Sequence, residues 1–75
     1  MDVDEAYKKL TERHRQVLEK LAELATLADE VAHAQHQFRR VEMDRYEELC
    51  QALDATLEDY TAARDRFGRV LRGEV

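Results

Sequence analysis

A seven-residue repeat of apolar side chains runs through most of this chain and constrains its fold more than any other feature. In the first half, one position of the repeat is filled by Leu10, Val17, Leu24, Val31 and Phe38. Apolar residues in such a repeat gather on one side of an α-helix, so the pattern predicts a helix that packs against another helix. Strands and frequent turns are disfavoured because the chain has no Pro and only two Gly. The predicted fold class is therefore all-α.

A second position of the repeat completes the predicted contact seam of each half. In the first half it holds Tyr7, His14, Leu21, Ala28 and Gln35. The second half repeats the pattern in two sets, namely Tyr46, Leu53, Tyr60 and Phe67, and Met43, Cys50, Leu57, Arg64 and Leu71. His14, Gln35 and Arg64 are polar interruptions, which generally restrict register and partner choice at some cost in stability.

The two repeats are out of phase by one residue, and this slip locates a break in the chain. Charges agree with it, since acidic residues open each half and arginines close each half, as expected for two separate helix dipoles. We therefore predict a two-helix antiparallel coiled-coil hairpin, with helices at about residues 3–39 and 45–72 and a connection at about residues 40–44. The alternative is one continuous helix, because the run from Arg40 to Met43 contains no helix breaker.

Seventy-five residues form at most one small domain, here residues 1–75, and such a chain rarely stabilises itself with one core alone. Disulfides are one common remedy, but the single cysteine, Cys50, excludes an internal disulfide. Oligomerisation is another remedy. We therefore expect the hairpin to complete a helical bundle, either by forming a homodimer or by binding a partner helix.

Charge and hydropathy argue against nucleic acid and membrane as partners. The net charge is -5, and the arginine clusters are interleaved with acidic residues, so a polyanion would meet a weak or repulsive field. No apolar stretch approaches the length of a membrane span, and the acidic first residues are the reverse of a signal peptide. We expect a cytoplasmic protein.

Three features could carry chemistry, and packing or solvation explains each of them more simply. Glu30 and His33 have the spacing of paired metal ligands on a helix, and His36 lies close by, but they flank the predicted seam instead of facing it. His14 and Cys50 occupy seam positions, where they are expected to pack. The sequence has no Ser and no Gly-rich loop. We expect neither an enzyme nor a bound cofactor, and the metal-binding bundle remains an alternative.

The remaining interpretation is a protein-interaction module, an adaptor or small chaperone-like hairpin that binds partner helices through its apolar stripe. The apolar stripe is wider than a two-position seam, which favours contacts beyond the hairpin itself. The residues expected to bind a partner are Leu18, Leu49, Tyr46, Tyr60, Phe67 and Val70. A self-assembling structural or scaffold coiled coil is the alternative within the same fold class.

The run from Asp44-Arg45-Tyr46-Glu47 to Leu53-Asp54-Ala55, together with the size and the hairpin plan, resembles the small co-chaperones that hold needle subunits in type III secretion. The resemblance covers part of the second half. It departs from that family at the connection, which lacks the Gly or Pro common in those hairpins. The resemblance implies a co-chaperone that binds a helical subunit, and this is a further alternative.

Overall fold

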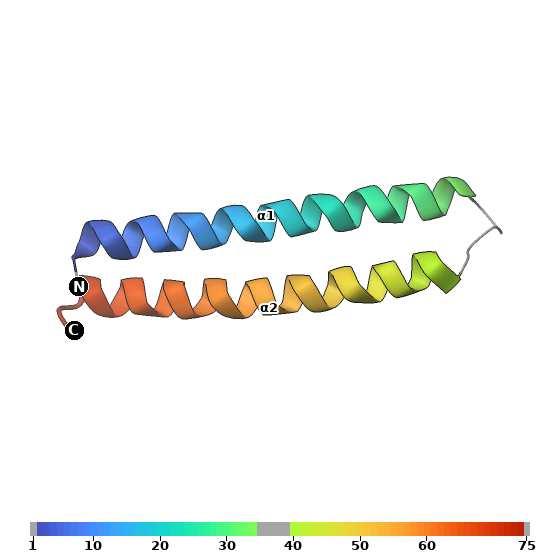
Figure 1. The fold of residues 1–75 in the computed structure, drawn as a ribbon. Helices are drawn as coiled ribbons and strands as arrows, with labels where there is room; N and C mark the ends of the chain where they lie inside the picture. Colours follow the sequence, from blue (N-terminus) through green and yellow to red (C-terminus); the bar gives the residue numbers. More distant parts are fainter. Residues whose placement is uncertain (1, 35–39, 75) are drawn as a thin grey trace.

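The structure is a computed structural model that describes residues 2–34 and 40–74. It contains two helices, α1 from Val3 to Ala34 and α2 from Arg40 to Leu71. The helices lie side by side and antiparallel, so that both termini are at one end of a rod of 55 × 15 × 13 Å (Figure 1). The predicted all-α hairpin is confirmed, and a single continuous helix is excluded.

The boundaries differ from the prediction at the start of the second helix. Residues 40–44, assigned above to the connection, are helical, because α2 already begins at Arg40. The lack of a helix breaker between Arg40 and Met43 is the physical reason, and Asp44 consequently lies inside the helix instead of capping it. The predicted end of the first helix, at residues 35–39, lies outside the described residues.

Local capping fixes the two helix ends at the open end of the hairpin. Asp2 precedes α1 and its carboxylate accepts a long hydrogen bond of 3.4 Å from the amide of Asp4. At the other terminus Gly73 adopts a left-handed φ of 74°. The amides of Gly73 and Glu74 donate to the carbonyls of Val70 and Arg69, which is the Schellman arrangement favoured by glycine after a helix.

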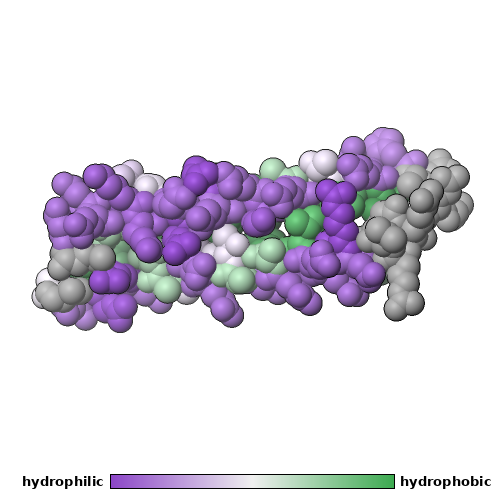
Figure 2. All heavy atoms as spheres, viewed as in Figure 1, coloured by the Kyte–Doolittle hydropathy of each residue, from purple (hydrophilic) through white to green (hydrophobic). Residues whose placement is uncertain are grey.

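The core of the hairpin is a narrow seam between α1 and α2. Among the described residues, the buried side chains are all apolar and are few, namely Ala6, Val17, Leu27 and Ala63. On the face drawn in Figure 2, hydrophilic side chains border both helices and hydrophobic atoms are concentrated in the strip between them. Of the large side chains whose burial the structure describes, only Leu27 is almost completely buried, at 1% exposure. A core of this size contributes little stability for a chain of this length.

Candidate interaction face

Two positions of the repeat were predicted to lie in the seam on each helix. One of them does, and the other is replaced by the residues one position earlier in the sequence. On α1 the predicted series Leu10, Val17, Leu24 and Val31 does face α2, with each residue buried or half-buried. On α2 the same holds for Leu53, Tyr60 and Phe67. These residues confirm the repeat as the signal for the contact between the helices.

The second seam position predicted for α1 is wrong. Its members, Tyr7, His14, Leu21 and Ala28, are all exposed. The residues one position earlier, Ala6, Arg13, Lys20 and Leu27, are buried or half-buried in their place. Gln35 lies outside the described residues.

The same rotation occurs in α2. Met43, Leu57, Arg64 and Leu71 are exposed, although Cys50 is half-buried. The second seam position is filled instead by Leu49, Thr56, Ala63 and Val70. Small residues at this position leave room for long side chains from α1, and Arg13 lies beside Ala63 in a shallow depression between the helices.

Two aromatic contacts define which residues of the two helices lie at the same level. The rings of Tyr7 and Phe67 have centroids 6.0 Å apart, and those of His14 and Tyr60 are 5.8 Å apart. Tyr7 and His14 share one side of α1, so these contacts mark one flank of the seam. The exposed apolar residues Leu57 and Leu71 border this flank on α2, because each lies one helical turn from Tyr60 or Phe67.

The opposite side of the seam, the paired flank, carries ion pairs between the helices. It consists of Arg13 and Glu30 on α1 with Asp59 and Arg45 on α2. Arg13 Nη1 lies 3.7 Å from Asp59 Oδ2, and Arg45 Nη1 lies 3.9 Å from Glu30 Oε2. Each pair joins oppositely charged residues across the seam, which agrees with the antiparallel register.

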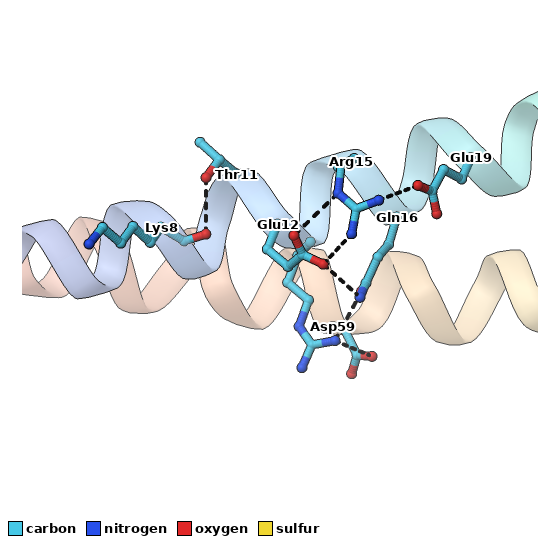
Figure 3. Close-up of polar contacts among 8 residues, drawn as sticks. Lys8, Thr11, Glu12, Arg15, Gln16, Glu19 and Asp59 are labelled. Carbon is cyan, nitrogen blue, oxygen red and sulfur yellow. Dashed lines mark hydrogen bonds and ion pairs between the residues drawn. The ribbon is translucent and has the colours of Figure 1, made fainter.

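A polar network on α1 extends the paired flank (Figure 3). Arg15 lies between Glu12 and Glu19 and bonds to both. The bond to Arg15 holds the pKa of Glu12 below its ordinary value of 4.5, and the same bond raises the pKa of Arg15. Gln16 links Glu12 to Arg13, which reaches Asp59 on α2. The charged side chains described on the paired flank therefore find their partners within the chain.

The flank that bears Tyr7 and His14 is different, and we call it the open face. It consists of Tyr7, His14, Leu18, Leu21, Ala25, Ala28 and Ala32 on α1 and Met43, Cys50, Leu57, Arg64 and Leu71 on α2. Its large apolar side chains are between 40% exposed, for Leu57, and 61% exposed, for Leu71. Among the described residues, no ion pair joins the helices on this side. An apolar strip that runs along both helices is the surface expected of an interaction site.

A band of polar side chains divides the open face near the termini. His14 contacts Tyr60, and Arg64 is one turn further along α2, so both lie between Tyr7 and Leu21 along the hairpin. Arg64 is not buried in the seam as predicted, because its side chain is 59% exposed and approaches Asp65 at 3.5 Å. The larger apolar part of the open face therefore lies on the side of the band away from the termini.

The six residues predicted to bind a partner separate into two groups. Leu49, Tyr60, Phe67 and Val70 are half-buried and hold the hairpin together. Leu18 and Tyr46 are exposed by 52% and 41%. The prediction missed Leu21, Leu57 and Met43 as exposed residues, because it placed them in the seam.

The residues considered for chemistry are engaged in other contacts or lie apart. Glu30 pairs with Arg45, and His33 Nδ1 lies 2.8 Å from the carbonyl oxygen of Asp29. His36 lies outside the described residues. Within the described part of the chain, no three His, Cys, Asp or Glu side chains gather as a metal site would require.

Neither α1 nor α2, over its described residues, has a stretch long and apolar enough to cross a bilayer. No protein-family model, curated protein or solved structure matches this chain.

Proposed function

We propose that this hairpin is a non-enzymatic protein-interaction module that binds helices through its open face. The observation that carries the proposal is the asymmetry of the two flanks, since one is closed by ion pairs and the other exposes Leu18, Leu21 and Leu57. A helix laid along the open face would meet apolar side chains from both α1 and α2. This is the helix-in-groove mode of recognition.

The core of the hairpin is small, so covering the open face would add stability that the core alone does not provide. Within the described part of the hairpin, the buried side chains are limited to Ala6, Val17, Leu27 and Ala63. Covering the exposed part of a leucine such as Leu21 would contribute about 1 kcal/mol, because full burial of such a side chain contributes about 1.5 to 3 kcal/mol. The open face carries six partly exposed large side chains, so covering all of them would contribute roughly 6 kcal/mol. They are Tyr7, Leu18, Leu21, Met43, Leu57 and Leu71.

The test compares two doubly substituted proteins that should fold equally well. Leu21→Gln with Leu57→Gln changes the open face, and Ala22→Gln with Glu58→Gln changes exposed positions on the outer sides of the same helices. Each tagged protein is purified from the cells that produce it and weighed by native mass spectrometry. Circular dichroism verifies that the variants keep their helix content.

We expect wild type and the outer-side variant to retain a bound chain, whether a second copy or another protein, and the open-face variant to lose it. A wild-type hairpin that is purified with nothing bound, at every protein concentration, would contradict the proposal. Equal retention by the two variants would show that any bound chain uses another surface.

A further inference from the structure

We infer that the chain bound by the open face is a second copy of this protein, packed face to face and running in the opposite direction. The inference rests on the proposed function of the open face and adds the identity and the direction of the partner. The two copies would form a four-helix bundle in which α1 packs on α1 and α2 packs on α2. A two-fold axis perpendicular to the helices would relate them.

The size of the face suits a dimer. The hairpin is 55 Å long and 15 Å wide, so one face offers roughly 800 Å², close to the ~800 Å² that each partner contributes to a standard protein interface. Both helices carry large apolar side chains along this face. A second hairpin covers both rows at once, whereas a single partner helix would cover only the groove between them.

The register of the hairpin determines where the axis would pass. The midpoint of Val3–Ala34 falls between residues 18 and 19, and that of Arg40–Leu71 falls between residues 55 and 56. The contacts of Tyr7 with Phe67 and of His14 with Tyr60 place these two midpoints opposite each other. Leu18 on α1 therefore lies next to the axis, where it would meet its own copy. Leu57 on α2 also lies near the axis, and Leu57 of one copy would be level with Asp54 of the other.

In this arrangement, large side chains face small ones. Met43 and Gly68 lie equally far on either side of the midpoint of α2, so Met43 of one copy reaches Gly68 of the other. Tyr7 correspondingly reaches the exposed segment of α1 between Ala28 and Ala32. Because the interface is two-fold symmetric, each of these contacts between the copies occurs twice.

Charge also selects the antiparallel direction. Arg64 and Glu47 lie equally far on either side of the midpoint of α2, and both border the open face. In the antiparallel dimer Arg64 of each copy meets Glu47 of the other. If the two copies ran in the same direction, α1 of one copy would pack on α2 of the other. Arg64 would then face the segment of α1 that holds Tyr7 and His14 and would not meet Glu47.

The test is a charge exchange followed by sedimentation equilibrium of the full chain. Arg64→Glu and Glu47→Arg should each weaken the dimer about tenfold or more, since each brings like charges together. The double variant should recover the dimer to within about threefold of wild type, because it restores opposite charges. Arg69→Glu and Glu48→Arg, exposed residues outside the open face, are the controls and should leave the dissociation constant unchanged.

A spin-label distance then tests the direction. With Cys50→Ala as background, a label at Glu5→Cys should lie about 40 Å from its copy, the length of roughly 27 residues of helix between two opposite ends. A distance below about 25 Å would place the same ends together and overturn the antiparallel dimer. Failure of the double charge variant to recover would overturn the Arg64–Glu47 contact and with it the proposed register.

The outcomes also separate this inference from the proposed function. A chain that stays monomeric at all concentrations, yet loses a different bound protein in the Leu21→Gln, Leu57→Gln variant, would overturn the dimer and support the interaction module. A monomer that binds no protein through Leu21 and Leu57 would overturn both.

Discussion

The two flanks of the hairpin have leucines at neighbouring positions of α1 but differ in side-chain exposure and in ion pairing. Leu27 and Leu21 are only six residues apart on α1, yet Leu27 is 1% exposed on the side of the paired flank and Leu21 is 45% exposed on the open face. On the paired flank, polar side chains from α1 find acidic or basic partners on α2. On the open face, the large apolar side chains of the described residues remain exposed. Polar groups can be satisfied by two helices, whereas a wide apolar surface needs more than two.

The largest effect is expected from truncating the two leucines that define the contrast. Leu27→Ala should destabilise the hairpin by roughly 2 to 5 kcal/mol, because it removes the one large side chain that is almost fully buried. Leu21→Ala should lower the free energy of unfolding by clearly less in dilute solution, where the hairpin is monomeric and Leu21 is 45% exposed. Urea unfolding followed by circular dichroism measures both values. Equal losses for the two variants in dilute solution would mean that Leu21 is already covered within the monomer.

A second effect concerns the dependence of stability on protein concentration. If the open face of each copy covers the other, the folded state should become more stable as the protein concentration rises. Each tenfold rise should increase the free energy of unfolding by about 1.4 kcal per mole of dimer. Leu57→Gln should abolish that dependence, and Glu58→Gln, its exposed neighbour, should preserve it. Thermal unfolding over a hundredfold range of concentration provides the measurement. A wild-type melting temperature that is independent of concentration would contradict the dimer.

A smaller effect is expected on the paired flank. Arg45→Glu should destabilise the hairpin by about 0.2 to 1 kcal/mol, because its pair with Glu30 is more than half exposed on both sides. Combining it with Glu30→Arg should restore most of the loss, and added salt should reduce the difference. A loss above about 2 kcal/mol, outside the range of exposed ion pairs, would show that this flank contributes more to the fold than its exposure indicates.

The smallest effect should come from acid titration of the network on α1. The pKa of Glu12 is lowered by its bond to Arg15, so the stabilisation is present above its ordinary value of 4.5 and is lost as the pH falls through the lowered pKa. Glu12→Gln should remove this part of the pH dependence, whereas Glu58→Gln on α2 should not. Unfolding curves between pH 2 and pH 7 give the comparison, and identical pH profiles for wild type and Glu12→Gln would count against the network.

The sequence predicted one of the two repeat positions in each contact seam correctly. The other position is shifted by one residue in the structure. Leu10, Val17 and Leu24 were assigned to the seam and lie there. The second position was assigned to Tyr7 and Leu21, whereas Ala6 and Leu27 occupy it in the structure. The signal that could have corrected the choice was charge across the hairpin, since Arg13 has Asp59 opposite it only when the helix is rotated toward the paired flank.

The start of α2 was misplaced for a similar reason. Asp44 and Glu47 have the spacing of a capping box, but the same spacing occurs inside any acidic helix. The residues before Asp44 lack a helix breaker, and the backbone is helical from Arg40. A local cap signal was therefore given more weight than the absence of any residue that ends a helix.

The amino-acid sequence by itself determined that this protein forms two helices that fold back on each other. The repeat, its one-residue slip and the charges at the ends can be read along the chain without knowing which residues meet across the hairpin. Only the tertiary structure decided how far each helix rotates about its own axis. That choice depends on how Arg13 fits beside Ala63 and reaches Asp59, which are contacts between residues far apart in the sequence. The rotation placed the charges on one flank and left Leu21 and Leu57 exposed on the other.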